Sequence, residues 1–568
     1  MVATRDPSMQ ASQLQGYALV LASCLALGQV IQMLGPSKKM RARPILWVFI
    51  LVSLVPYMVS IYTANQAQSL VPRVHPLEAV IVNAKMEFEG MLARQSKNYP
   101  TAEREYRRRH GIDPPPGFQE WYIFAREYQS PVIDEFDMIL ESIRPFLRLS
   151  GKEINTIIKK AANTPNVELW DCNFSLDRIG TGSNTTECTH PWRTNDRHFG
   201  LMFDRLLKDI PKRPLDVRFL VNHLDEPRVL IPPSSGSDKG QFQLTDLTQK
   251  STWDAITKHC PSNADKGGRV EGAFTFITNN SQAMDLCAHP EYKNMHGLFI
   301  GPTSFGLIEG TVPILSTGAP STMGDILFPS PAYNVESDFH YNPGHDVGWD
   351  KKKNKLYWAG STTGGFVSDR SWTSFHRQRF VSLAQNLEPK QHTYLQESNK
   401  GVVEQKKTSF WNGRLFDVAF TRIFQCARKN CHDQRQHFRT RNWADKDEAM
   451  KYKLAFDLDG NGISGRYYKL LASKSVPLKQ TVLKEWHDER LMPWVHYVPV
   501  SLGMEELPEL IFWLTSTKAG QERAKAIAEQ GREWYNKAFR EVDMGIYVYR
   551  LMLELARVQD PGREAFAV

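Results

Sequence analysis

Short apolar runs separated by polar, helix-like segments recur along most of this 568-residue chain. The runs are rich in β-branched and aromatic residues and are bounded by Gly, Pro, Asn or Asp, which is typical of buried strands. The predicted strands lie at 216–222, 272–278, 297–301, 325–330, 355–361, 452–460 and 494–500. Helical patterns follow at 374–385 and 464–473, and this alternation predicts parallel sheets. Two such blocks indicate an α/β fold of two domains with a ligand-binding cleft between them.

Outside these blocks the pattern is mainly helical. An amphipathic helix is predicted at 201–210, and a strongly helical segment at 521–557. Three consecutive prolines at 114–116 cannot continue a helix, so we expect an extended elbow there and a new helix from about Phe118.

Two uncharged apolar segments near the N-terminus, 17–35 and 45–63, each have about the length of a membrane-spanning helix. The first contains Gln29 and Gln32 and is the weaker candidate. A basic stretch, 38–43, lies between them, and if it is cytosolic the rest of the chain is luminal, whether one segment spans or two. A cleaved signal peptide is less favoured, because the second run is long and no clear small-residue cleavage site follows it.

Cysteines and glycosylation sequons fit a luminal placement. Six cysteines fall into three pairs of close sequence neighbours, as short-loop disulfides do in an oxidising compartment, although the sequence alone does not fix their connectivity. These are Cys172, Cys188, Cys260, Cys287, Cys426 and Cys431. Sequons occur at Asn173, Asn184 and Asn279. Each arises easily by chance, but behind a membrane anchor they favour a secretory-pathway protein.

Charge adds little to this picture. The formal net charge is +8 and the basic residues are scattered, so we expect an ordinary solvated surface and no nucleic-acid partner.

The stretch KLYWAGSTTGGF, 355–366, passes from a predicted buried strand into a turn of small residues that begins with Gly360, Ser361 and Thr362. Backbone N–H groups and hydroxyls in such a turn can hold phosphate oxygens, although an ordinary glycine-rich turn is the alternative. It is not a Walker loop, because no G-K-[ST] ends it. Arg377 and Arg379 follow two positions apart on the predicted helix, so only one of them can point at the turn.

A second glycine turn occurs within DLDGNGISGRYYKLL. It imitates the start of a calcium loop, but Tyr468 stands at the twelfth position, where a bidentate Glu is needed. Asp457 and Asp459 form a D-x-D pair, which is too common to support a metal site. We expect instead an anion site without a metal, formed by free N–H groups at the start of the next helix and by Arg466.

Asp225 and Glu226, in NHLDEPRV, lie where a predicted strand ends at the edge of the cleft. Strand ends in such sheets commonly carry catalytic groups, and a carboxylate there can act as a general base toward a hydroxyl. A solvated turn carboxylate is the alternative.

Several blocks occur together in the order found in a known family. They are RHGIDPPPGFQEWYIFA (109–125), HLDEPRV (223–229), WDKKKNKLYWAGSTTGGF (349–366), HRQRFVSL (376–383), DGNGISGRYYKLLASKSVPLKQ (459–480) and PWVHYVPV (493–500). From about Tyr99 to its C-terminus the chain resembles glycosyltransferase family 90, which includes capsule-associated proteins and protein O-glucosyltransferases. The PPPGF-x-EWY block is similar to a fungal branch that includes β-1,2-xylosyltransferases.

The resemblance implies a GT-B fold, with two Rossmann-like domains, and an inverting transferase that takes sugar from a UDP-sugar without a metal or another cofactor. Asp225 is then the base that deprotonates a glycan acceptor. Arg377 is the better match to the family's donor-binding arginine, with Arg379 kept as the alternative. The implied donor-binding residues are Gly360, Ser361, Thr362, Arg377, Asn461, Gly462, Ile463, Ser464, Gly465 and Arg466.

The chain also departs from the family. Ala359 stands where relatives commonly have Arg, which bears on donor affinity or identity. The terminal EAFAV is no ER-retention signal, so we expect a membrane-held Golgi enzyme rather than a soluble ER one. UDP-xylose is the favoured donor. The alternatives are UDP-glucose with the same machinery, a non-catalytic glycan- or nucleotide-binding relative, and, ranked low, a hydrolase.

These inferences give a domain plan. It comprises an anchor (1–70), a stem and helical extension (71–195), a first Rossmann-like domain with the base (196–340), a second with the donor site (341–530) and a C-terminal helical segment (531–568).

Overall fold

The structure, a computed structural model, describes residues 29, 75–175, 185–193, 197–211, 215–233, 241–261, 276–397 and 403–566. The predicted membrane-spanning segments, 17–35 and 45–63, lie outside the described residues except for Gln29. Within the described ranges, no helix combines the length and the apolar composition needed to cross a bilayer. The anchor stays a prediction, as do the domain boundaries.

The chain divides into two compact units. The smaller comprises Met1–Val80 and Lys390–Phe410. Its described part contains an antiparallel hairpin of β10 (His392–Glu397) and β11 (Val403–Thr408). The larger unit, formed by the rest of the chain, holds the sheets described next and all the predicted catalytic and donor-binding residues.

A mixed five-stranded sheet in the larger unit has the order β2-β1-β3-β7-β8. Strand β1 (Leu169–Ser175) pairs antiparallel with β2 (Thr185–Thr189) and with β3 (Asp216–Asn222). Strands β7 (Ile314–Ser316) and β8 (Ile326–Leu327) continue parallel to β3. Because β1 is antiparallel to both neighbours, β2 and β3 run in the same direction and end at the same edge.

The second five-stranded sheet is parallel throughout, in the order β12-β9-β13-β14-β15. Its strands are β12 (Phe416–Arg422), β9 (Lys353–Ser361), β13 (Tyr452–Leu458), β14 (Val476–Gln480) and β15 (Val498–Pro499). All five carboxyl ends meet at one edge, where ligands bind in sheets of this kind. The prediction of an α/β fold with a parallel sheet is confirmed here.

A small third sheet orders β4 (Val229–Leu230), β6 (Gly306–Gly310) and β5 (Phe242–Asp246), with β6 in the middle. Strand β4 follows β3 closely in the sequence. The loop that carries Asp225 is therefore fixed by a strand at each end.

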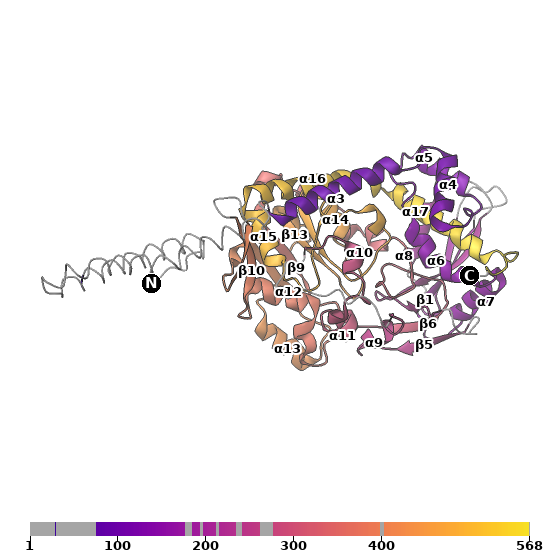
Figure 1. Cartoon of the computed structure of the whole chain (residues 1–568). Helices are drawn as coiled ribbons and strands as arrows, with labels where there is room; N and C mark the ends of the chain where they lie inside the picture. The colour runs from indigo at the N-terminus through magenta and orange to yellow at the C-terminus, as the bar shows by residue number, and fades with distance from the viewer. Residues whose placement is uncertain are drawn as a thin grey trace, which may run out of the picture. The chain divides into compact units, whose positions relative to one another are not determined.

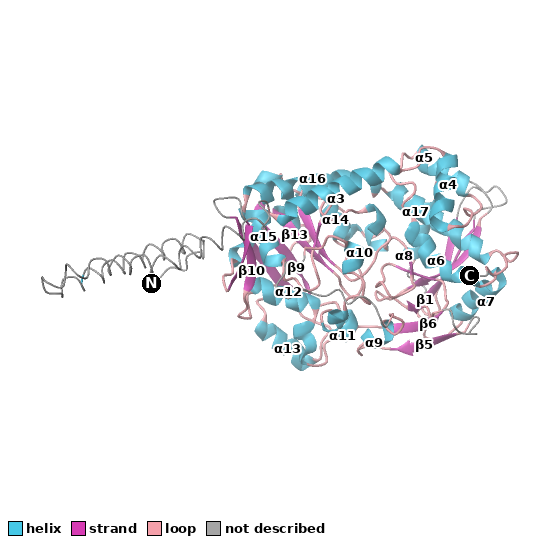
Figure 2. Ribbon diagram, viewed as in Figure 1, coloured by secondary structure: helices cyan, strands magenta, loops and turns pink. Residues whose placement is uncertain are grey.

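Helices surround these sheets, and Figures 1 and 2 show how they are arranged with the strands of the larger unit. Helix α12 packs against β12, and α14 against β14. The described helices are α3 (Pro76–Arg94), α4 (Tyr99–His110), α5 (Phe118–Glu127), α6 (Asp137–Ile143), α7 (Gly151–Ala162), α8 (His198–Leu207), α9 (Trp253–Ile256), α10 (Asn280–Ala283), α11 (Gly297–Ile300), α12 (His376–Gln385), α13 (Arg428–His437), α14 (Tyr467–Ala472), α15 (Leu507–Ser516), α16 (Lys518–Ala538) and α17 (Glu541–Gln559). Those predicted from Phe118, at 201–210 and at 521–557 are confirmed, with shifted ends and a break between α16 and α17.

Helix α17 ties the helical N-terminal part to the core and contacts α5, α6, α7 and α8. The Trp121 indole donates to the Ile546 carbonyl at 2.9 Å. The buried Arg550 guanidinium lies over the rings of Tyr106, Phe118 and Trp121. Burial of these aromatic rings and the cation–π contacts stabilise the packing of α4 and α5 against α17.

The strand prediction at 297–301 is wrong, and the one at 494–500 is right only at Val498–Pro499 (β15). Of the strand predicted at 272–278, residues 272–275 lie outside the described residues. Residues 297–300 form helix α11, which His296 caps by accepting a hydrogen bond from the Leu298 amide at 3.2 Å. A short buried apolar run does not distinguish strand from helix by periodicity. Residues 494–497 form a turn, in which Trp494 has a φ of 67°. There the Met492 amide donates to Nδ1 of the buried His496 at 2.9 Å.

Three disulfide bonds join cysteines that are close in the sequence. They are Cys172–Cys188, Cys260–Cys287 and Cys426–Cys431. The first links β1 to β2, whose Cys172 and Cys188 are partners in the strand register. Of the sequons, Asn173 and Asn279 are exposed, and Asn184 lies outside the described residues.

Candidate active site

The loop after β3 presents Asp225 at the carboxyl end of the mixed sheet. Asn222, the last residue of β3, holds this loop with both side-chain atoms: its oxygen accepts from the Leu224 amide at 3.0 Å, and its nitrogen donates to the Glu226 carbonyl at 2.8 Å. The loop reverses over a few residues because one asparagine satisfies its main-chain groups. The Asp225 side chain remains exposed to solvent at its tip.

Asp225 lies directly against the second glycine turn, which follows β13 of the parallel sheet. A Cβ added to Gly462 would overlap the main-chain oxygen of Asp225, so only glycine allows this approach. Loss of hydration among the surrounding atoms raises the pKa of Asp225, and a hydrogen bond from Asn461 opposes the rise. Despite its exposed tip, the carboxylate is therefore a stronger base than a fully solvated one.

Asn461 joins three loops at this point. Its side-chain oxygen accepts hydrogen bonds from the Thr303 hydroxyl at 3.1 Å and from the Gly364 amide at 3.0 Å. Together with the bond to Asp225, these contacts bring the loops after β3 and β13 and the glycine turn after β9 to one place. Gly364 belongs to the predicted turn, whereas Thr303 was not predicted, although the turn-rich stretch GPTSFG around it was a usable signal.

Glu226 turns inward, unlike its neighbour. It is 1% exposed and accepts from the Ser304 amide at 3.0 Å and from the Ser304 hydroxyl at 2.9 Å. Burial raises its pKa to about 7, while the bonds from Ser304 oppose the shift. Of the two adjacent carboxylates, only Asp225 is exposed to solvent.

The glycine turn after β9 is held from several sides. Thr362 is buried, and its hydroxyl donates to the Phe424 carbonyl at 2.7 Å, so this residue fixes the turn. Gly360 and Ser361 keep partial exposure. Gly364 has a φ of 117°, and a Cβ there would meet the His376 ring at 2.5 Å, so both conformation and space require glycine. Gly360, Ser361 and Thr362 were predicted to contact the donor. Of these three, Thr362 is the one that is not accessible to solvent.

Arg377 binds the backbone of the two loops. Its guanidinium donates to the carbonyls of Asp459 at 2.7 Å, Ser361 at 3.0 Å and Leu458 at 3.2 Å, and to the Thr363 hydroxyl at 2.5 Å. Burial, followed by the positive charge of Arg466, lowers its pKa to about 9. Arg377 therefore links the end of β9 to the end of β13 through its hydrogen bonds.

Arg379 points elsewhere and is not solvated. Its guanidinium donates to the carbonyl of Leu502 at 2.8 Å and to those of Met295 and Gly503 at 3.3 Å. Arg377 is thus the arginine of this pair that faces the glycine turn.

Arg466 is the more accessible guanidinium at the same edge. It is partly exposed and donates to the Ala359 carbonyl at 2.8 Å. The guanidinium carbons of Arg466 and Arg377 lie 5.9 and 5.7 Å from the centre of the Trp358 ring. Two cationic groups beside one ring, at the carboxyl ends of β9 and β13, create a positive potential suited to an anion.

The D-x-D carboxylates are engaged within the protein. Asp457 and Asp459 are 1% and 2% exposed. Asp457 accepts from the Ser464 hydroxyl at 2.5 Å, and Asp459 from the Thr481 hydroxyl at 2.9 Å and the Val482 amide at 3.0 Å. They fix the second glycine turn and the loop after β14.

The rest of the second turn is packed tightly. A Cβ on Gly318 would meet Ile463 Cγ2 at 2.5 Å, and one on Gly465 would lie 3.0 Å from the Phe339 ring. Helix α14 begins at Tyr467, so the predicted anion-binding residues before it belong to the turn rather than to the helix.

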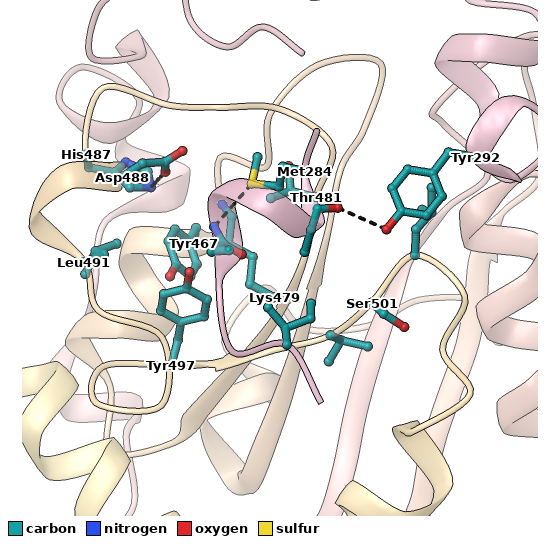
Figure 3. A pocket seen from close by; sticks show the side chains of 15 residues that line it. Met284, Tyr292, Tyr467, Lys479, Thr481, His487, Asp488, Leu491, Tyr497 and Ser501 are labelled. Carbon is teal, nitrogen blue, oxygen red and sulfur yellow. Dashed lines mark hydrogen bonds and ion pairs between the residues drawn. The ribbon is translucent and has the colours of Figure 1, made fainter. Parts of the chain in front are cut away.

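A small cavity of about 20 Å³ adjoins this edge at the carboxyl ends of β14 and β15 (Figure 3). Lys479, Thr481 and Ser501 line it beside Tyr467 and Tyr497. The Lys479 ammonium lies 3.8 Å from the centre of the Tyr467 ring. These residues were not predicted from the sequence, although their positions at strand ends were a signal for them.

Comparisons with known proteins agree with the resemblance in the sequence. Residues 385–562 match the model of Glycosyl transferase family 90. The chain is 28% identical over 164 residues to "Protein O-glucosyltransferase 2" of Danio rerio, which covers 29% of this chain and 31% of the relative. It is 32% identical over 111 residues to "Protein O-glucosyltransferase 3" of Rattus norvegicus, covering 19% and 21%.

A more extended match, 24% identical over 239 residues, is to "Uncharacterized protein 179R" of Invertebrate iridescent virus 6, covering 40% of this chain and 18% of the relative. The matches thus span less than a third of each of these relatives. The family match includes the second glycine turn but begins after Asp225 and after the glycine turn that follows β9. The resemblance to the family is confirmed, and the role of Asp225 stays a prediction.

Proposed function

We propose that this chain, which carries a glycosyltransferase family 90 sequence over residues 385–562, is an inverting transferase of the GT-B type that moves a sugar from a UDP-sugar to an acceptor hydroxyl. The observation that carries this proposal is the contact of Asp225 with Asn461 and Gly462. It brings the only exposed carboxylate of the DE pair to the edge where the two arginines lie.

In the proposed reaction the acceptor hydroxyl attacks the anomeric carbon of the donor. Asp225 takes the hydroxyl proton while the new carbon–oxygen bond forms and the bond to the diphosphate breaks. A single displacement inverts the anomeric centre, so an α donor gives a β linkage. UDP leaves with the bonding electrons.

Arg466 is suited to oppose the negative charge that grows on the departing diphosphate, because its guanidinium is partly exposed and already oriented by the Ala359 carbonyl. Arg377 acts through position: its bonds to main-chain carbonyls keep both turns in register. We propose that this arrangement works without a metal, since Asp457 and Asp459 are committed to internal hydrogen bonds.

Two donors remain in competition. The fungal-branch motifs favour UDP-xylose, whereas relatives named O-glucosyltransferases make UDP-glucose at least as good a candidate. Xylose lacks only the exocyclic CH₂OH of glucose, so the choice depends on how the donor pocket treats that group. A glycan acceptor and a luminal, membrane-held setting, Golgi rather than ER, complete the proposal; the disulfide bonds support an oxidising compartment.

The test is UDP release by the full-length chain, purified in detergent, from a panel of UDP-sugars with EDTA present. Release from one donor that is lost in Asp225→Asn, while that variant still binds the donor, supports transferase and base together. Preference for UDP-glucose would replace the sugar and keep the mechanism. If no UDP-sugar binds, the transferase proposal fails; binding without turnover on any acceptor favours the non-catalytic alternative, which the substitution at Ala359 keeps open.

A further inference from the structure

Trp192 lies near the same edge of the mixed sheet as Asp225. It is the third residue after β2, as Asp225 is the third after β3, and both strands run toward the same edge. Only β1 separates β2 from β3, so the two strands lie about 10 Å apart side by side. The register places Thr189, the last residue of β2, level with Leu220, two residues before the end of β3. An oligosaccharide whose reactive sugar lies at Asp225 has its next unit within reach of Trp192.

A continuous set of rings connects the two positions. Trp192 lies 6.3 Å from His190, and His190 lies 5.9 Å from His223, measured between ring centres. The buried Trp170 supports both histidines: its ring lies 5.0 Å from His190, and its indole donates to His223 Nδ1 at 3.1 Å. His223 precedes Asp225 by two residues, so this layer of rings leads to the proposed base.

Trp192 is itself 58% exposed, which is unusual for the largest apolar side chain. Its backbone is fixed, since the Trp192 amide donates to His190 Nδ1 at 3.3 Å. The neighbouring Arg193 forms an ion pair with Glu168 at 3.2 Å. An exposed ring on a fixed backbone, with planar charged groups beside it, suits a sugar: the apolar face stacks on the ring and the hydroxyls bond to the charged groups.

We propose that Trp192, supported by His190 and flanked by Glu168 and Arg193, is an acceptor subsite that stacks on a sugar ring of a neutral glycan, one unit away from the hydroxyl at Asp225. The inference rests on the proposed function and adds to it the part of the acceptor that is recognised. It makes the enzyme selective for an oligosaccharide over a single sugar.

The test compares Trp192→Ala with Trp192→Phe and with Trp443→Ala in the full-length chain. Trp443 is a matched control because it is 76% exposed and lies after helix α13, away from the mixed sheet. The probes are methyl glycosides of mannose, glucose and galactose and linear oligosaccharides of the same sugars. UDP release without acceptor, and the KM for the UDP-sugar, report on the donor site separately.

Removing the indole should raise the KM for the preferred oligosaccharide by about tenfold, as loss of a tryptophan anchor commonly does. The methyl glycoside, acceptor-free UDP release and the donor KM should stay unchanged, and the Phe variant should recover most of the loss. An equal effect on the methyl glycoside and the oligosaccharide, or no effect, overturns the subsite. So does a loss confined to transfer onto a folded, disulfide-bonded protein domain.

Failure of the proposed function is distinguishable. If the wild-type chain transfers no sugar, binding of the same oligosaccharides is measured by saturation-transfer NMR. Binding that Trp192→Ala weakens and Trp443→Ala leaves intact supports the subsite without catalysis. Absence of binding to the wild-type chain overturns it.

Discussion

Asp225 lies against Gly462 and its neighbour Asn461, although the two loops follow strands of two different sheets. The same asparagine accepts from Thr303 and Gly364, so one side chain fixes the proposed base against both glycine turns of the parallel sheet. The geometry on which the proposed transfer depends is concentrated in this junction.

Replacing Asn461 by Ala should shift the pH dependence of turnover. The bond from Asn461 holds the pKa of Asp225 down, so its loss should raise that pKa and leave the base protonated up to a higher pH. The acidic limb of the kcat/KM profile should therefore move to higher pH. Asn354→Ala, which removes an amide bonded to the Thr515 carbonyl at 2.7 Å, is the control. An acidic limb that stays in place would show that Asp225 does not govern it.

Gly462→Ala should separate the two loops. The added methyl group overlaps the main-chain oxygen of Asp225, so one backbone must move, at a cost of about 1–3 kcal/mol in the free energy of unfolding. We expect a lower Tm and a larger relative loss of UDP release. Gly348→Ala is the matched control, because a Cβ there meets nothing within 4 Å. Equal behaviour of the two variants would contradict the close approach.

Replacing Arg466 should mainly reduce turnover, whereas replacing Arg377 should mainly reduce the free energy of unfolding. Arg466→Ala removes one bond to a carbonyl and should cost about 1 kcal/mol of stability, yet lower turnover by about 100-fold or more if it opposes charge on the leaving diphosphate. Arg377→Ala removes hydrogen bonds to three main-chain carbonyls and one hydroxyl and should cost about 3 kcal/mol. Denaturant unfolding and UDP release, measured on both variants, check this contrast. The reverse order of stability losses would disprove the assignment.

Glu226 should make stability fall with rising pH. Its pKa is about 7 in the fold against an ordinary 4.5, so the folded state binds the proton more tightly. Stability is then highest below the unfolded pKa and declines as pH rises through 7, by up to about 3 kcal/mol. Glu226→Gln keeps an acceptor for the Ser304 amide and should flatten that part of the curve. The free energy of unfolding is measured by chemical denaturation at pH 5 and pH 8, with the exposed Glu404→Gln as control. If wild type and Glu226→Gln lose the same stability between these two pH values, the assignment to Glu226 is wrong.

The sequence was informative where local chemistry dominates. The strand ending at Asn222 and the glycine turn after Ser361 follow from apolar runs that stop at residues unsuited to strands. Helix α5 begins at Phe118 because the prolines before it cannot extend a helix. The same rules failed at 297–300, where a buried apolar run is compatible with either structure, and at Trp494, whose positive φ depends on its surroundings.

By itself the sequence determined that carboxylates, glycines and arginines stand at the ends of strands, because strand propensity and chain reversal are local properties. Only the tertiary structure decided which of them meet. In the tertiary structure Glu226 is buried against Ser304, whereas Asp225 is exposed. Arg377 donates to main-chain carbonyls, whereas Arg466 stays partly exposed. These differences depend on packing between loops that are far apart in the sequence and belong to two sheets. Local periodicity does not predict such contacts.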